Sequence, residues 1–159
     1  MEGIVDSLRD RDCRKVMVIG ATDTGKTFLA LALAERLGAE GLRVGVLDFD
    51  LGQSCVGPPG VVGLQLPWGG EGSGPLFPTA MVFLGYLSPA WDIDGLVRAG
   101  VKLEELAFRL GCDVLIMDTS GMVEGNLAAL LKRLKIRKLR PDLILALDWA
   151  GETGHIFRG

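Results

Sequence analysis

The stretch that most constrains this chain is 20–27, which reads Gly-Ala-Thr-Asp-Thr-Gly-Lys-Thr. It matches the pattern G-x-x-x-x-G-K-[ST] at every fixed position. Glycines let the backbone curl closely around a phosphate, and the positive end of a following helix adds to the field. An apolar run at 15–20 precedes the stretch, and a run of helix formers at 26–37 follows it, with Gly38 as the expected C-cap. The sequence therefore predicts a strand, a phosphate-binding loop and a helix in succession.

This loop predicts a nucleotide-binding site with defined roles for two residues. Lys26 is expected to reach the β- and γ-phosphates, and the Thr27 hydroxyl is expected to bind Mg²⁺. The alternative is a glycine turn with a surface lysine, which the flanking strand and helix disfavour. The residues expected to bind the nucleotide are Gly20, Ala21, Thr22, Asp23, Thr24, Gly25, Lys26, Thr27 and Phe28.

Short apolar runs alternate with helical segments along the rest of the chain. Such alternation predicts an α/β protein whose parallel sheet is covered on both faces. We expect a single domain over 1–159, with the three-layer P-loop NTPase fold and a mostly parallel five-stranded sheet flanked by helices. The expected strands are 16–19, 43–48, 80–84, 112–118 and 143–147, and the expected helices are 26–37, 94–110 and 126–138.

Two segments stand outside this alternation. Residues 1–13 predict a short helix or an arm. Much of the glycine and proline of the chain falls within 52–79, which predicts a long active-site loop rather than a buried element.

The charge, the cysteines and the lack of long apolar runs limit which partners and which cellular compartment are expected for this chain. A net charge of −3 means that any nucleic acid has to be held by a local patch. The three cysteines have no metal-binding spacing and are expected to be reduced, as in the cytoplasm. No signal peptide and no run of membrane-spanning length is visible, so no membrane partner is expected.

Acidic residues follow two of the expected strands. Asp118 ends an apolar run, where an aspartate in a protein with a phosphate loop commonly holds Mg²⁺; the alternative is a helix cap or a turn. Asp48 and Asp50 are two residues apart, so on an extended strand their side chains point the same way. One of them is expected to contact Mg²⁺ while the other accepts a proton, the alternative being a charged turn.

Five motifs in this order resemble those of a known family. They are 20–27, 47–54 (Leu-Asp-Phe-Asp-Leu-Gly-Gln-Ser), 57–60 (Gly-Pro-Pro-Gly), 83–89 (Phe-Leu-Gly-Tyr-Leu-Ser-Pro) and 118–121 (Asp-Thr-Ser-Gly). Together they resemble the polynucleotide 5′-hydroxyl kinases, in a short archaeal or bacterial-like form. This family includes RNA kinases of tRNA splicing, pre-mRNA 3′-end formation and ribosomal RNA processing. The resemblance runs from about residue 16 to 147, and the Asp-x-Asp-x-Gly-Gln element followed by Pro-Pro-Gly is its discriminating part.

The resemblance implies transfer of the γ-phosphoryl group of ATP to the 5′-hydroxyl of RNA or DNA, with ATP and Mg²⁺ as cofactors. It implies Lys26, Asp50 and Asp48 as catalytic residues, with Asp50 activating the hydroxyl. The implied metal ligands are Thr27, Asp118 and Asp50. The residues implied to face the nucleic acid are Gln53, Pro58, Pro59, Gly60, Thr119, Ser120 and Gly121.

The chain departs from the family pattern at two places, and other functions stay open. Met122 stands where some members carry an aromatic residue that stacks on a base. The sequence stops at Gly159, so a C-terminal lid with phosphate-clamping arginines is expected to be absent. Either the chain is a truncated fragment, or a partner protein or second subunit supplies the clamp, or activity is weak. The alternatives are a nucleotide-gated dimeric P-loop ATPase or GTPase switch, and a non-catalytic ATP-binding subunit of an RNA-processing complex.

A basic run at 132–140 places six cations in nine residues. It predicts either a patch that binds the RNA backbone or, as the favoured interpretation, the solvated C-terminal face of a helix. In the second interpretation the buried face of that helix is formed by Leu127, Leu130, Leu131 and Leu134.

Overall fold

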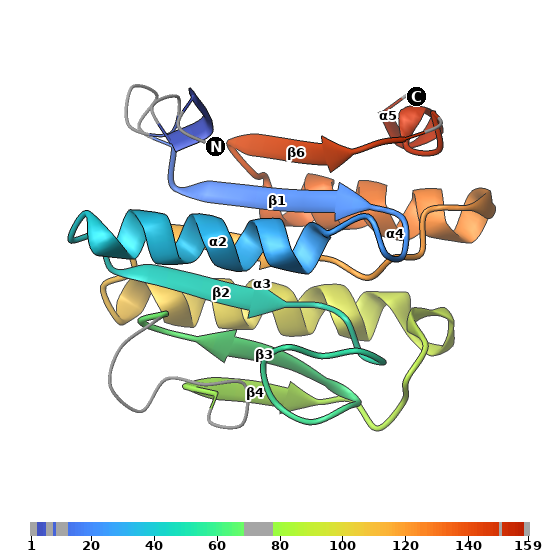
Figure 1. The fold of residues 1–159 in the computed structure, drawn as a ribbon. Coiled ribbons are helices and arrows are strands. Elements are labelled where there is room, and N and C mark those ends of the chain that lie inside the picture. The colour runs from blue at the N-terminus through green and yellow to red at the C-terminus, as the bar shows by residue number, and fades with distance from the viewer. Residues whose placement is uncertain (1–2, 6–7, 9–12, 69–77, 150, 158–159) are drawn as a thin grey trace.

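The computed structural model describes residues 3–5, 8, 13–68, 78–149 and 151–157. Six strands form one sheet in the order β4-β3-β2-β5-β1-β6. Helix α2 covers one face of the sheet, and α3 and α4 cover the other (Figure 1). The elements are β1 (Lys15–Gly20), α2 (Lys26–Ala39), β2 (Val44–Asp48), β3 (Val61–Gln65), β4 (Ala80–Phe83), the 3-10 turn η1 (Pro89–Trp91), α3 (Ile93–Arg109), β5 (Val114–Asp118), α4 (Gly125–Leu139), β6 (Leu143–Leu147) and α5 (Gly154–Phe157).

The interior positions of the central strands β1, β2 and β5 carry no polar side chain because both faces of the sheet are covered. In β1, Met17 and Ile19 pack with the α3–α4 side, whereas Val16 and Val18 pack with the α2 side. None of these four side chains is exposed to solvent. The sheet therefore lies between two apolar cores, and the phosphate loop starts from a strand whose last five residues are buried.

The prediction of a long loop over 52–79 was wrong, because the segment contains a buried strand. All five residues of β3 are buried, and the strand pairs antiparallel with β2 and with β4. The sheet therefore has six strands rather than five, and β3 alone runs against the others (Figure 1). Gly57 and Gly60, with φ of 91° and 82°, turn the chain into β3. Residues 69–77 lie outside the described residues.

The helix boundaries differ slightly from those expected. Gly38 is not the C-cap of α2, since the helix continues to Ala39 and Gly41 takes the left-handed conformation with φ 89°. In the predicted N-terminal arm, residues 3–5 and 8 are helical. No helix within the described parts of the chain has the length and apolar character needed to cross a membrane.

Helix α4 is rotated relative to the expected orientation. Leu127 and Leu130, predicted as buried, are 42% and 49% exposed. Lys132 and Lys135 are 0% exposed, so neither interpretation of the basic run holds for these two residues. The face that α4 buries consists of Ala128, Ala129, Leu131, Lys132, Lys135 and Leu139.

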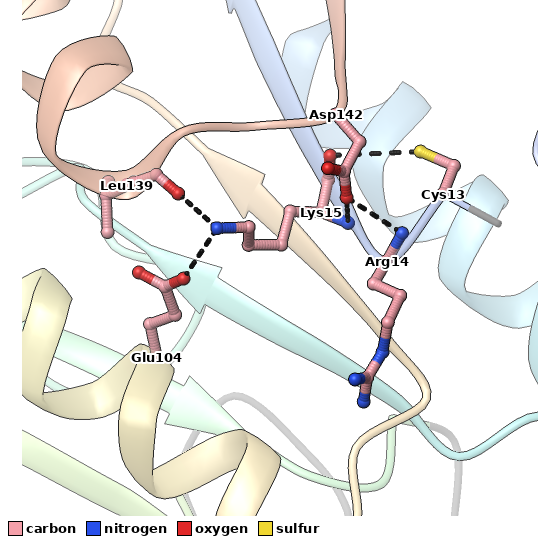
Figure 2. Close-up of polar contacts among 6 residues, drawn as sticks. All are labelled: Cys13, Arg14, Lys15, Glu104, Leu139 and Asp142. Carbon is pink, nitrogen blue, oxygen red and sulfur yellow. Dashed lines mark hydrogen bonds and ion pairs between the residues drawn. The ribbon is translucent and has the colours of Figure 1, made fainter. Parts of the chain in front are cut away.

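The amino-terminal ends of the strands are tied together by polar contacts, which Figure 2 shows. The Asp142 carboxylate accepts hydrogen bonds from the backbone N–H groups of Arg14 and Lys15, at 2.9 and 2.8 Å. Lys15 Nζ donates to Glu104 Oε1 on α3 at 3.0 Å and to the Leu139 carbonyl oxygen on α4 at 2.6 Å. Burial raises the pKa of Glu104, and the bond from Lys15 opposes that shift. These contacts connect α3 and α4 to the amino-terminal ends of the strands, at the end of the sheet opposite the phosphate loop.

A pair of helical glycines provides a test of this packing. A Cβ at Gly100 in α3 would lie 2.3 Å from the Phe49 ring, whereas a Cβ at Gly38 in α2 would meet nothing closer than 3.8 Å. We expect Gly100→Ala to lower the free energy of unfolding by about 1–3 kcal/mol through overpacking. We expect Gly38→Ala to raise it by about 0.5–1 kcal/mol through helix propensity. Urea denaturation of both variants would test this, and a stabilised Gly100→Ala protein would contradict the packing of Phe49.

Candidate active site

The phosphate loop joins β1 to α2 at the carboxyl end of the sheet. Asp23 and Gly25 have φ of 60° and 86°, so the loop bends through two left-handed positions. The Lys26 ammonium donates to the Ala21 carbonyl oxygen at 2.6 Å, and the Thr24 hydroxyl donates to the same oxygen at 2.8 Å. The Lys26 side chain therefore folds back across the phosphate loop, next to the N-terminus of α2.

The turn after β5 packs directly on this loop. A Cβ at Gly121 would lie 2.8 Å from the backbone nitrogen of Thr22, so no larger residue fits here without displacing the loop. The Thr27 hydroxyl donates to Asp118 Oδ2 at 2.6 Å, which joins α2 to the end of β5.

Asp118 is buried and only partly satisfied. Its side chain is 1% exposed, and its Oδ1 atom has no hydrogen-bond partner within the described part of the chain. The pKa of Asp118 is raised to about 6, chiefly by burial and also by the nearby Asp48 and Asp50, while Thr27 and Lys26 oppose the shift. A carboxylate held this way favours a cation beside it.

The raised pKa of Asp118 predicts that the free energy of unfolding of the ligand-free protein depends on pH. Because the folded state binds the Asp118 proton more tightly than the unfolded state does, stability is lost as pH rises toward and through about 6. We expect Asp118→Asn to stabilise the protein by up to about 3 kcal/mol at pH 7.5 and by only about 1 kcal/mol near pH 4.5. Urea denaturation at both pH values measures this. The matched control is Asp23→Asn, because Asp23 is exposed and has no burial cost to relieve; an equal effect of Asp118→Asn at the two pH values would refute the prediction.

Asp48 closes the loop that follows β2 rather than facing a pocket. Its Oδ1 accepts from the N–H of Asp50 at 2.8 Å. Its Oδ2 accepts from the Ser54 hydroxyl at 2.9 Å and from the N–H groups of Cys55 and Val56 at 2.5 and 3.1 Å. Burial raises the pKa of Asp48, and these bonds oppose the shift. The carboxylate is 1% exposed and fully engaged, so the geometry favours a structural role for it over the expected catalytic one.

Asp50 is the carboxylate of this segment that faces the site. It is half-buried, and its Oδ1 accepts from the N–H groups of Gly52 and Gln53 at 3.1 and 3.0 Å. Asp50 and Gln53 line two adjoining pockets. The first is formed by Thr22, Asp23, Gly25, Lys26, Thr27, Phe28, Asp50, Gln53 and Gly121, and the second by Thr22, Asp50, Leu51, Gly52, Gln53, Leu87, Ser88, Pro89, Ser120, Gly121 and Met122.

The donor set fits a divalent cation. The Thr27 hydroxyl and the free Oδ1 of Asp118 are hard oxygen ligands of the kind that Mg²⁺ prefers. Asp48, Cys55 and Asp118 also place one potential ligand atom each within 4.8 Å of one another. Burial raises the pKa of the Cys55 thiol well above its usual range, so this side chain is a protonated neighbour of the carboxylates.

The structure gathers some of the predicted nucleic-acid residues and separates others. Gln53, Ser120 and Gly121 line the second pocket. Thr119 is 1% exposed and its hydroxyl donates to the Val18 carbonyl oxygen at 2.8 Å, so its side chain points into the interior. Pro58 and Pro59 are exposed and, with Gly60, line neither pocket. A Cβ at Gly60 would lie 3.7 Å from the Phe83 ring at the end of β4.

Leu87, Ser88, Pro89 and Met122 form the other side of the second pocket, although the sequence identified them only as part of a family motif and as a departure from the family pattern. Sequence reasoning missed the buried lysines of α4. Their spacing was a usable signal, because Ala128, Leu131, Lys135 and Leu139 recur at helical intervals on one face.

The fold and the site together define a P-loop nucleotide-binding protein, with the glycine loop, the buried lysine and the Thr27–Asp118 pair at the carboxyl ends of parallel strands. The family model described as the mRNA cleavage and polyadenylation factor CLP1 P-loop matches residues 20–157. The chain therefore belongs to the CLP1 P-loop family.

Relatives and solved structures agree with this placement. The chain is 40% identical over 145 residues to the polyribonucleotide 5′-hydroxyl-kinase PH0197 of Pyrococcus horikoshii. The aligned region covers 91% of this chain and 40% of that protein. It is 33% identical to the polyribonucleotide 5′-hydroxyl-kinase MJ1315 of Methanocaldococcus jannaschii, over 91% and 40% of the two chains. The fold is similar to Clp1p in the Clp1p–Pcf11p complex, with a TM-score of 0.74, 17% identity, and coverage of 98% and 44%. The chain thus spans about two fifths of the length of the curated relatives that it matches.

Proposed function

We propose that this chain carries the catalytic site of an ATP-dependent polynucleotide 5′-hydroxyl kinase. The observation that carries the proposal is the position of Asp50, which lines both adjoining pockets. The first pocket contains the phosphate loop and suits the triphosphate of ATP. The second adjoins it on the side of Asp50 and Gln53 and suits the 5′ end of RNA or DNA. The curated relatives named above as polyribonucleotide 5′-hydroxyl kinases support the same substrate class.

The residues of the chain divide the work of phosphoryl transfer. Lys26 leaves the Ala21 carbonyl oxygen and binds the β- and γ-phosphate oxygens, while backbone N–H groups of the loop hold the rest of the triphosphate. Thr27 and Asp118 are the residues that would hold magnesium, which neutralises charge on those phosphates when it is bound. Asp50 orients the 5′-hydroxyl and takes its proton as the oxygen bonds to the γ-phosphorus and the bond to the β-phosphate oxygen breaks.

Other residues of the site are assigned to the acceptor substrate, and the cysteines indicate the compartment. Gln53, Ser120 and Gly121 contact the terminal nucleotide, and any further clamp on the phosphates comes from a partner or from another part of a longer protein. Cys13, Cys55 and Cys112 are thiols rather than members of disulfides, which is compatible with the reducing cytoplasm, where we place the reaction.

Formation of ADP in the presence of oligonucleotides tests this function. We expect ADP release from ATP and Mg²⁺ to depend on an oligonucleotide with a 5′-hydroxyl and to stop with the same oligonucleotide carrying a 5′-phosphate. Equal ADP release with and without the oligonucleotide would instead indicate a nucleotide-gated switch. Binding of ATP with no ADP formed over hours would indicate a non-catalytic ATP-binding subunit.

A further inference from the structure

Helix α4 buries two lysines directly behind the carboxylates of the candidate site. Lys132 and Lys135 are both 0% exposed, whereas Arg133, Arg137 and Lys138 of the same helix are exposed. Moving an ammonium group out of water is costly unless fixed partners replace the lost hydration. The groups that these two ammonium groups contact therefore indicate what the lysines do.

Lys132 binds the turn that follows Asp118. Its Nζ donates to the Thr119 hydroxyl oxygen at 2.8 Å and to the Ser120 carbonyl oxygen at 2.5 Å. The Thr119 hydroxyl in turn donates to the Val18 carbonyl oxygen in β1 at 2.8 Å. One buried ammonium group thus connects α4, the turn after β5 and the strand that leads into the phosphate loop.

Lys135 contacts the other acid-bearing turn. Its Nζ lies 4.3 Å from the centroid of the Phe49 ring and has no hydrogen-bond partner within the described part of the chain. Phe49 stands between Asp48 and Asp50, and its N–H donates to the Asp118 carbonyl oxygen at 3.0 Å. The backbone of Phe49 therefore ties the turn 48–50 to the end of β5, and its ring is the part of this turn that Lys135 contacts.

Burial and the nearby carboxylates shift the pKa values of the two lysines in opposite directions. Burial lowers the pKa of Lys135 to about 7 and also lowers that of Lys132, while Asp48, Asp50 and Asp118 favour the charged form of Lys135. The two lysines repel each other, and Lys26 adds to the repulsion on Lys132. Asp50 and Asp118 thus favour the charged forms of both lysines against the cost of burial.

We propose that Lys132 and Lys135 are positioning residues that hold the turns 118–121 and 48–50 in the geometry needed for magnesium and the triphosphate. This inference rests on the proposed kinase function for its kinetic consequence but not for its structural one. Lys132 fixes the turn that carries Gly121 against the phosphate loop. Lys135 fixes Phe49, and through it Asp50. Neither lysine touches the substrates.

Hydrogen exchange of the two turns, followed by mass spectrometry, tests the positioning directly. We expect Lys132→Met to speed exchange in a peptide covering 117–123 by about 10-fold and to leave a peptide covering 47–52 unchanged. We expect Lys135→Met to produce the reverse pattern. Lys138→Met, an exposed lysine on the same helix, is the matched control and should change neither peptide.

Kinetics and stability separate positioning from a general structural role. Methionine removes a buried charge without removing volume, which offsets the cost of leaving the Ser120 carbonyl oxygen without its donor, so the melting temperature of Lys132→Met should change little. We nevertheless expect its kcat to fall about 10- to 100-fold with KM for the oligonucleotide little changed, as for residues that orient the ligands of a metal site. Lys132→Arg, which keeps the donor, should retain more activity.

Three results would overturn the proposal: unchanged exchange in both turns, exchange that rises throughout α4, or a kcat that falls only in step with the melting temperature. If the wild-type chain forms no phosphorylated product, the kinase function fails while the exchange pattern still decides the positioning role. If Lys132→Met does not fold, Lys135→Met makes the corresponding test at the turn 48–50, with Lys138→Met as its control.

Discussion

Replacing Lys26 with methionine is expected to lower kcat/KM for phosphoryl transfer by about 1000-fold, the size of effect seen when a charge-stabilising donor is removed from a transition state. Lys26 is 7% exposed, and its ammonium lies at the mouth of the phosphate loop, where it donates to the Ala21 carbonyl oxygen. Methionine fills the same volume without the charge. Steady-state kinetics with ATP, Mg²⁺ and a 5′-hydroxyl oligonucleotide gives the value.

The control for this variant is Lys102→Met, which removes an exposed lysine from α3, away from the phosphate loop. That variant should keep wild-type kinetics. If Lys26→Met transferred phosphate at a rate within a few fold of the wild-type rate, the proposed role of the phosphate loop in phosphoryl transfer would be wrong.

Replacing Asp50 with asparagine is expected to reduce kcat by about 100- to 10,000-fold while ATP binding is largely retained. Asparagine can keep the oxygen that accepts the Gly52 and Gln53 N–H bonds, so the turn should survive, but it cannot take a proton from the 5′-hydroxyl. Calorimetry of ATP binding alongside the kinetics separates the two effects.

Glu35→Gln is the matched control for the charge change, because Glu35 is exposed on α2. It should alter neither ATP binding nor kcat. A fully active Asp50→Asn protein would exclude Asp50 as the proton acceptor, and loss of ATP binding instead of kcat would assign it to the nucleotide pocket.

The same reasoning separates Asp50 from Asp48. Sequence spacing alone treats the two aspartates alike, because both follow the same strand. In the structure Asp48 accepts four hydrogen bonds from its own loop, whereas Asp50 lines both pockets. The role of each aspartate therefore depends on the path of the chain after β2, which local pattern does not reveal.

The parts of the fold that the sequence predicted well are those determined locally. The phosphate loop, α2 and the apolar strands β1 and β5 depend on glycine positions and on hydrophobic runs that read the same in any context. Asp118 was identified because it ends a buried strand, and the structure places it beside Thr27 as expected.

The parts that the sequence did not predict depend on tertiary packing. Strand β3 is a short apolar run surrounded by glycines and prolines, and it is held by its neighbours β2 and β4. Lys132 and Lys135 look like surface residues by type, and only the close approach of α4 to the turns after β2 and β5 gives them buried partners. Residue type was a poor guide at α4 because the partners come from distant parts of the chain.

The most direct measurement is the mass and position of the product phosphate. A short RNA with a 5′-hydroxyl should gain one phosphate from ATP, and digestion should place it on the 5′ oxygen, with the 3′ end unmodified. An RNA of unchanged mass, incubated with folded protein that binds ATP and Mg²⁺, would contradict the assignment of the two pockets to donor and acceptor.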